Sequence, residues 1–274
     1  MIDSSSLSHF ILLVKFNWLS SSNQTIFYLF WPIFRNLAPV ASAYLVFGKI
    51  LEQNSGEIPY HIWVLSGASF WVVFSGSISI AANLFSSNIR RKRFHLGNIS
   101  PKNVMKSIHF LPQVIAFLLT VPCLIYTLSN FHGTESIVRL ILVLVFLIFF
   151  ANIMIYVSFH VAILCAFLRD FRYILPWMSQ LILLISPIFY LPRESNSITE
   201  HILETINPIN YVLEINRFLL FGESIESTLR IYMFLSLAIV YCVLSSFKLN
   251  SLLMKFLFVM TADNYFEEEE KPSA

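Results

Sequence analysis

The chain has 274 residues, of which 57% are hydrophobic and only 12% are charged. An average soluble domain carries about 25% charged residues, and a single water-soluble core of this size has no room for 27 phenylalanine side chains. This composition excludes an ordinary soluble domain, and we expect an integral membrane protein whose helices face lipid. The net charge of +2 says little, whereas the placement of the charges is informative.

Residues 1–25 predict a cytoplasmic amphipathic helix that lies in the membrane interface. Leu7, Ile11, Val14 and Trp18 recur at helical spacing with polar residues between them, so that one face is apolar. A leader with no fixed position is the alternative. Lys15 is the single basic residue of this stretch, and we do not expect a cleavable signal peptide.

Residues 26–248 predict an all-α membrane domain of six transmembrane helices. A helix that crosses about 30 Å of hydrocarbon needs about 20 mostly apolar residues. Six stretches meet this condition, and the fourth is long enough to tilt or project. They are Ile26–Ile50, Ile62–Phe85, Val104–Leu128, Ile137–Leu168, Ile174–Leu191 and Ile231–Phe247.

Lysine and arginine are concentrated on one side of the predicted spans. The loop of residues 86–103, the loop after the fourth span and the tail of residues 249–274 hold most of them. Basic residues stay on the cytoplasmic side, so we expect both termini in the cytoplasm. The acidic run Glu267–Glu270 indicates a solvated tail.

Two features of the spans predict helix contacts. Gly67 and Gly76 lie near Ser75 and Ser79 in the second span, and small residues let helices approach closely. This suits a helix–helix or subunit interface. In the fourth span we expect His160 to be neutral and hydrogen-bonded to a neighbouring helix.

Arg35 and a set of aromatic residues are candidates for a polar passage. A charge at a helix centre costs roughly 2.5–3.5 kcal/mol on insertion scales, so Arg35 should face a cavity or a partner, unless it snorkels to the interface. Aromatic residues near span ends form interfacial belts or flat faces that line a pore for sugars. The aromatic candidates are Tyr28, Trp31, Trp63, Trp71, Phe74 and Tyr190.

The stretch of residues 192–225 is too polar for a span and too apolar for an ordinary loop. It mixes apolar residues with charged ones such as Glu214 and Arg217, and Asn207-Pro208 ends any helix that enters from its N-terminal side. We interpret the stretch as two short helices that dip into the outer leaflet and return, shielded by protein or a water-filled cavity. An extracellular amphipathic hairpin is the alternative.

The sequence contains no nucleotide-binding motif. Gly48-Lys49 lacks the upstream glycine and the following hydroxyl residue of a phosphate loop. There is also no nucleophile elbow or zinc-binding helix, and the three cysteines and seven histidines lack metal-site spacing. We therefore expect no cofactor in this chain, so that any ATP-driven work must come from a partner.

The cytoplasmic loop of residues 86–103 is the densest polar element. It begins Ser86-Ser87-Asn88-Ile89-Arg90-Arg91-Lys92-Arg93-Phe94-His95. A short basic helix at this place suits docking in a cleft of a cytoplasmic motor domain. The alternative is a charge cluster that sets topology and touches anionic lipid headgroups.

Several segments together resemble the polysaccharide-export permeases of ATP-binding-cassette transporters. These belong to the type-2 export class, which carries O-antigen, capsule or teichoic acid chains. The similar segments are Gly56-Glu57-Ile58-Pro59-Tyr60, Ser86-Ser87-Asn88 with the basic run, Phe167–Ile174 leading into Ser186–Tyr190, and Asn207–Arg217. The resemblance runs from about Trp31 to Phe247. Phe94–Asn98 departs from the family's aromatic-Pro-Arg stretch, which affects the docking contacts but not the topology.

This resemblance implies a half-channel rather than an enzyme. Two copies of the chain would pair, each on one copy of a separate ATPase that binds ATP and Mg²⁺. An undecaprenyl-linked polysaccharide would be threaded outward through the bacterial inner (plasma) membrane, in contact with membrane lipid and without nucleic acid. The residues that would couple to the ATPase are Ser86, Ser87, Asn88, Arg90, Arg91 and Arg93.

The resemblance also implies roles at the two mouths of the channel. Arg169, Asp170 and Arg172, with Arg35, would lie near the cytoplasmic mouth, where arginines grip lipid phosphates. An intracellular ion-pair cluster is the alternative for the first three. The residues of an outer, re-entrant gate would be Asn207, Pro208, Tyr211, Glu214 and Arg217.

Two other functions stay open. An exporter of drugs, haem or lipids has the same architecture, and fold alone does not choose the substrate. A membrane-embedded sugar or acyl transferase needs clustered intramembrane carboxylates or histidines. Asp170 is the one acidic residue near a predicted span on the cytoplasmic side, which favours transport.

Overall fold

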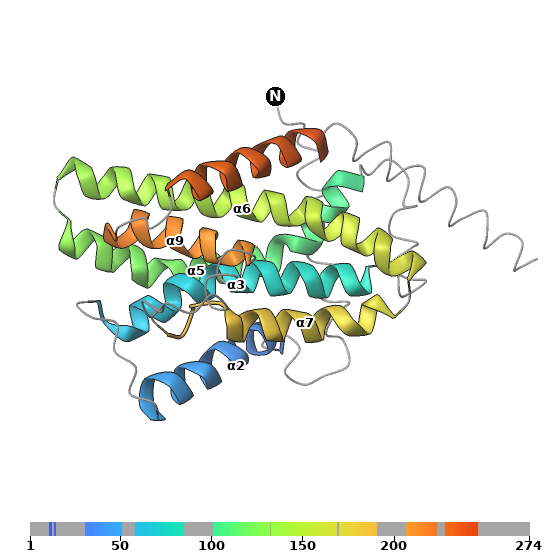
Figure 1. The fold of residues 1–274 in the computed structure, drawn as a ribbon, viewed down its shortest axis with the longest axis horizontal. Coiled ribbons are helices and arrows are strands. Elements are labelled where there is room, and N and C mark those ends of the chain that lie inside the picture. The colour runs from blue at the N-terminus through green and yellow to red at the C-terminus, as the bar shows by residue number, and fades with distance from the viewer. Residues whose placement is uncertain are drawn as a thin grey trace, which may run out of the picture.

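The computed structural model describes residues 11–12, 14, 31–50, 58–84, 101–131, 133–168, 170–190, 207–223 and 228–245. These residues are almost all helical, and no strand occurs among them (Figure 1). The predicted all-α fold is therefore confirmed for this part of the chain.

The described helices follow one another along the chain. In order they are α2 (Trp31–Tyr44), the π-helix η1 (Leu45–Ile50), α3 (Tyr60–Asn83), α5 (Pro101–Asn130), α6 (Thr134–Phe167), α7 (Phe171–Ile185) and α9 (Pro208–Phe221). The last is Thr228–Ser245, here called helix 228–245.

Four of these helices are long and apolar enough to cross a membrane. They are Tyr60–Asn83, Val104–Asn130, Thr134–Phe167 and Thr228–Ser245. They correspond to the second, third, fourth and sixth predicted spans and identify the chain as a membrane protein. At 1.5 Å per residue, α6 is about 51 Å long and exceeds the roughly 30 Å hydrocarbon core.

The fifth predicted span is shorter in the structure, and the first is described only from Trp31 onward. Their apolar helices are Ala38–Ile50 and Phe171–Ile185, and the 15 residues of α7 reach only about 22 Å. Residues 26–30 lie outside the described part of the chain. A total of six spans thus stays a prediction.

Other predictions also fall on segments that the structure does not describe. Of the N-terminal amphipathic helix, Ile11, Leu12 and Val14 are helical, and the first two are exposed. The coupling loop lies outside the described residues up to Pro101, where α5 begins. The same holds for residues 191–206 and 224–227 and for the tail from residue 246 onward.

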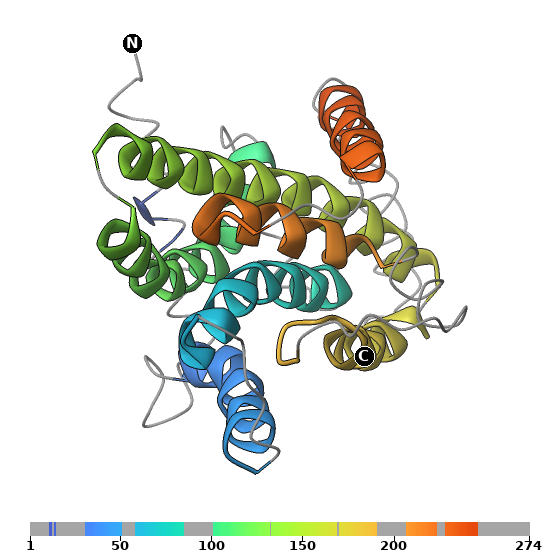
Figure 2. The same cartoon turned by 60° about the vertical axis from the view of Figure 1, so that its left-hand side comes forward.

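α3 is the central helix of the bundle and packs against α2, α5, α6, α7 and α9 (Figures 1 and 2). A Cβ atom added at Gly76 would lie 2.8 Å from Cγ of Pro112 in α5, and one at Gly67 would lie 3.0 Å from Cγ2 of Ile188. These contacts confirm the predicted close packing of the small residues in this helix.

Buried hydroxyl groups in α3 bond within their own helix. Ser66 Oγ donates to the Trp63 carbonyl at 2.7 Å, and Ser69 Oγ donates to the Ser66 carbonyl at 2.9 Å. A serine that bonds back to its own helix needs no partner elsewhere. α3 therefore presents small side chains to its neighbours without unpaired hydroxyl groups at these positions.

An aromatic junction joins the first helix to α3 and to the segment after α7. Tyr44 stacks on Tyr60 with ring centroids 5.6 Å apart, and Phe47 of η1 stacks on Phe189 at 5.8 Å. The Tyr60 hydroxyl donates to the Phe189 carbonyl at 2.6 Å. Three elements that are distant in sequence meet at this point.

Helix 228–245 lies at the edge of the bundle beside α6 (Figure 2). The Tyr241 hydroxyl is 2.9 Å from Nδ1 of His160, which also lies 2.8 Å from the Tyr156 carbonyl. This confirms the expected hydrogen bond between His160 and a neighbouring helix.

Candidate functional site around helix α9

α9 begins at the boundary that the sequence predicts. Oδ1 of Asn207 accepts a hydrogen bond from the Ile209 amide at 3.1 Å, and Pro208 occupies the first turn, where a missing N–H costs nothing. The other end of the Asn207 amide, Nδ2, donates to Oγ of Ser186 at 2.7 Å. The N-terminal end of α9 is thereby tied to the residue that follows α7.

α9 spans only about half the length of the helices around it. Ile209 and Leu213 share a core cluster with Trp71 in the middle of α3, and Val212 shares one with Phe150 in the middle of α6. At the other end, the partners change to residues near the ends of α3, α5 and α6. These are Ile62, Cys123 and Val143, which cluster with Leu220. α9 thus starts half-way along the bundle and finishes at one end.

The buried side of α9 carries two polar side chains that bind α3 and the segment after α7. Nδ2 of Asn216 donates to the Ser66 carbonyl at 3.0 Å. Arg217 donates from Nη2 to the Pro187 carbonyl at 2.7 Å, and its Cζ lies 3.5 Å from the centre of the Trp63 ring. The side chains of Asn216, Arg217 and Trp63 are all buried, with Arg217 only 4% exposed.

Arg217 is a buried cation without a carboxylate within ion-pair distance among the described residues. The guanidinium keeps its proton in proteins, so burial leaves a charge that the Trp63 ring, one carbonyl and the electrostatic attraction of Glu223 offset. Nε of Arg217, Nε1 of Trp63 and Oδ1 of Asn216 have no hydrogen-bond partner in the part of the chain that is described. Buried polar atoms without partners are uncommon, which makes this cluster a candidate functional site.

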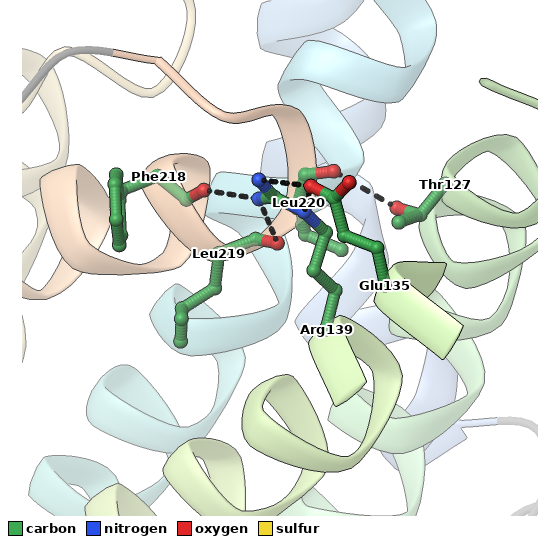
Figure 3. Close-up of polar contacts among 6 residues, drawn as sticks. All are labelled: Thr127, Glu135, Arg139, Phe218, Leu219 and Leu220. Atoms are coloured by element: carbon green, nitrogen blue, oxygen red, sulfur yellow. Dashed lines mark hydrogen bonds and ion pairs between the residues drawn. The ribbon is translucent and has the colours of Figure 1, made fainter. Parts of the chain in front are cut away.

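The C-terminal end of α9 is held by the hairpin of α5 and α6 (Figure 3). Nη1 of Arg139 donates to the carbonyls of Phe218 at 3.0 Å and Leu219 at 3.2 Å. Oγ1 of Thr127 lies 3.1 Å from the Leu220 carbonyl and 2.9 Å from the Cys123 carbonyl of its own helix, so its one proton is shared between the two acceptors. Gly222 ends the helix in the left-handed conformation, at φ 75°, with its amide on the Phe218 carbonyl.

Sequence reasoning missed Arg139 and Thr127. The one available signal was Gly222, because glycine is typical after a helix end. A basic residue on the same side of the membrane would be the expected partner. That signal does not name the partner, because the acceptors are backbone carbonyls that any residue provides. Arg139 lies 79 positions before Phe218, and only the fold brings them together.

All five predicted gate residues lie on α9 or at its cap. Asn207 and Arg217 face the protein interior as described above. Tyr211 packs against Phe234 of helix 228–245 with ring centroids 5.5 Å apart, and Glu214 is half-buried. The structure therefore groups Asn207, Pro208, Tyr211, Glu214 and Arg217 on one short helix, and their role as a gate stays a prediction.

Three of the predicted channel aromatics, Trp63, Trp71 and Phe74, belong to one hydrophobic cluster. Trp63 and Trp71 are each 2% exposed and pack inside the bundle, with Phe74 next to Trp71 at 5.4 Å between ring centroids. Tyr190 donates to the Ile185 carbonyl. Trp31 begins α2, and Tyr28 lies outside the described residues. Their exposure to a passage stays a prediction.

At the predicted cytoplasmic mouth, Asp170 directly precedes α7 and is exposed. Nη2 of Arg172 lies 3.4 Å from the Tyr173 hydroxyl, and the guanidinium lies over that ring at 5.1 Å. No ion pair joins Asp170 to Arg172, so these two do not form the alternative ion-pair cluster. Arg169 and the side chain of Arg35 lie outside the description, as do the coupling residues Ser86, Ser87, Asn88, Arg90, Arg91 and Arg93.

Neither a protein-family model nor a curated protein sequence matches this chain. The described residues also hold no group of three His, Cys, Asp or Glu side chains placed to bind a metal ion. α9 and its surroundings are therefore the candidate functional site of the described residues.

Proposed function

We propose that this chain is the membrane subunit of an ATP-binding-cassette exporter that moves an undecaprenyl-linked polysaccharide outward across a bacterial inner membrane. The observation that carries the proposal is α9, a 14-residue helix that begins half-way along a bundle of apolar helices. The buried Arg217 on it strengthens the argument.

A helix that ends inside a membrane domain exposes unpaired backbone groups, and these are tolerated only beside protein or a water-filled cavity. Here Asn207 caps the inner end, and Arg139 and Thr127 cap the outer end. Helix ends at membrane depth and intramembrane charges are typical of transport pathways. The geometry of α9 therefore favours a transport passage. A membrane domain with only a structural role would be more stable with full-length helices.

The proposed architecture combines the helices of the structure with the segments that only the sequence predicts. α2 with η1 and α7 serve as the first and fifth spans, α9 is the returning half of a re-entrant segment, and both termini are cytoplasmic. Two copies of the chain enclose the passage, and a separate ATPase docks on the loop of residues 86–103. The choice of a polysaccharide rests on the resemblance of the segments, above all Asn207–Arg217.

The test is transport by the purified complex in proteoliposomes. The full-length chain is co-purified with an ATPase encoded beside it, and the probe is a fluorescent undecaprenyl-pyrophosphate-linked oligosaccharide. We expect ATP-dependent movement of the probe. Its rate should fall about tenfold in the double variant Arg90→Glu with Arg91→Glu, a loss within the range of typical coupling free energies between sites. Lys255→Glu with Lys271→Glu makes the same change of charge in the tail and should leave the rate unchanged.

Four outcomes would contradict the proposal. An ATPase that does not co-purify, or transport that is unaffected by the arginine substitutions, argues against ATPase docking on the loop of residues 86–103. Movement of a drug, haem or phospholipid but not of the oligosaccharide favours the other class of exporter. Transfer of a sugar or acyl group by the chain alone, without ATP, identifies a membrane-embedded transferase.

A further inference from the structure

The outer end of α9 is bound to the α5–α6 hairpin through the three carbonyls that follow Arg217. The last carbonyls of a helix mostly lack a partner within it, although that of Phe218 also accepts from the Gly222 amide. Arg139 donates to those of Phe218 and Leu219, and Oγ1 of Thr127 contacts that of Leu220. Figure 3 shows both side chains reaching α9 from the two helices of the hairpin.

The charge of Arg139 fits this position. A helix carries a partial negative charge at its C-terminal end, and a cation there is stabilising. Arg139 is held by Oε1 of Glu135, which lies 3.0 Å from both Nε and Nη2, and by the Phe131 ring at 4.3 Å. The guanidinium is thus fixed on one side while its Nη1 points at α9.

Most of α9 is bound to a different part of the protein. At its start Asn207 bonds to Ser186, and further along Asn216 bonds to the Ser66 carbonyl of α3. Arg217, one residue before the carbonyls that Arg139 contacts, bonds to the Pro187 carbonyl. α9 is therefore bound to α3 and the segment after α7 as far as Arg217, and to the α5–α6 hairpin at its last turn.

We propose that Arg139 is a positioning residue that makes the outer end of α9 follow the α5–α6 hairpin. A shift of the hairpin relative to α3 then bends the last turn of α9, since the helix as far as Arg217 stays with α3 and the segment after α7. The connection between Arg139 and the end of α9 lies within this chain and does not depend on what the chain transports. Its effect on export rests on the proposed function, in which α9 belongs to the outer gate.

The planar fork of arginine is needed for this role. Arg139 bonds to Glu135 through Nε and Nη2 while Nη1 contacts two carbonyls. A lysine ammonium is a single point charge and cannot hold both sides in this geometry. Lysine should therefore retain the charge effect at the helix end and lose the rigid connection.

The first measurement is hydrogen exchange on the full-length protein in nanodiscs. Arg139→Gln should speed exchange of the Leu219–Gly222 amides about tenfold or more, the factor expected for loss of charge-assisted hydrogen bonds. Peptides that cover Ile209–Leu213 should be unchanged. Glu135→Gln should have a smaller effect in the same place, and Arg139→Lys an intermediate one.

The matched control is Ser129→Ala. Ser129 lies in the same turn region, is exposed, and donates only to the Tyr126 carbonyl of its own helix, so its removal should not alter exchange in α9. Unchanged exchange at Leu219–Gly222 in Arg139→Gln would overturn the proposal. So would an equal rise throughout the protein, because that result means general destabilisation.

The second measurement is probe movement per ATP hydrolysed in the reconstituted complex. Arg139→Gln should lower this ratio, with partial recovery in Arg139→Lys, whereas a merely structural defect lowers transport and hydrolysis together. Faster local exchange with an unchanged ratio would overturn the positioning role. If the unsubstituted complex moves no probe, the proposed function fails, and the exchange result still decides whether Arg139 ties α9 to the hairpin.

Discussion

α3 and helix 228–245 are both long and apolar enough to cross a membrane, yet they occupy opposite places in the fold. In the most apolar stretch of α3, 72% of the residues are buried, against 17% in helix 228–245. α3 lies at the centre and helix 228–245 at the edge beside α6 (Figure 2). Apolar character therefore brings a helix into the membrane but does not decide where it sits.

Side-chain size accounts for the difference. Lipid is as apolar as leucine, so membrane helices associate through close packing rather than through the hydrophobic effect. α3 offers Gly67 and Gly76 to its neighbours, whereas helix 228–245 carries exposed large residues such as Tyr232 and Leu237. The following predictions test this explanation.

The largest effect is expected from Gly76→Ile. Its Cβ would lie 2.8 Å from the rigid ring of Pro112, so α3 and α5 must separate, at a cost of about 3 kcal/mol. Reversible unfolding in mixed detergent and SDS micelles, followed by circular dichroism, measures the loss. Ser236→Ile is the matched control, because Ser236 is exposed and bonds within its own helix. Equal losses for the two variants would refute the explanation by side-chain size.

An intermediate effect is expected from one truncation made in both helices. Val72 of α3 is fully buried and Val240 of helix 228–245 is 53% exposed. Val72→Ala leaves a cavity and should cost about 1–2 kcal/mol, whereas Val240→Ala should cost less than about 0.5 kcal/mol. The same unfolding measurement decides. A cost at Val240 as large as that at Val72 would mean that helix 228–245 is packed against something that covers it.

The smallest effect is expected from Tyr241→Phe. This change removes the hydrogen bond to His160 and should cost about 0.6 kcal/mol, the average for polar contacts between membrane helices. A double-mutant cycle with His160→Phe isolates the pair. A coupling above about 2 kcal/mol would show that this contact, and not packing, holds helix 228–245 in place.

The contacts of α9 differ in the same way along the helix. As far as Arg217 it is held by buried amides and a buried cation, and at its last turn by Arg139, which is 19% exposed. A partly exposed contact is cheaper to break, because water can replace the lost partner. Substitution of Arg139 should therefore loosen the last turn of α9 and leave the rest of the helix folded.

Much of the fold was predictable from local patterns. The spans at 62–85, 104–128, 137–168 and 231–247 match four long helices of the structure, because length and apolar composition are properties of a segment alone. Asn207-Pro208 predicts a helix boundary for the same reason, since its effect is steric and local. The fifth helix, Phe171–Ile185, is shorter than expected because it ends within an apolar run that continues past it.

By itself the sequence determined that this is a helical membrane protein, where four of its long helices run and where α9 begins. Only the tertiary structure decided which helix is central, that Arg217 lies on Trp63, and that Arg139 and Thr127 hold the end of α9. The physical reason is that apolar length and proline act within a few residues. The acceptors of Arg139 and Arg217, by contrast, are backbone carbonyls that carry no sequence signal.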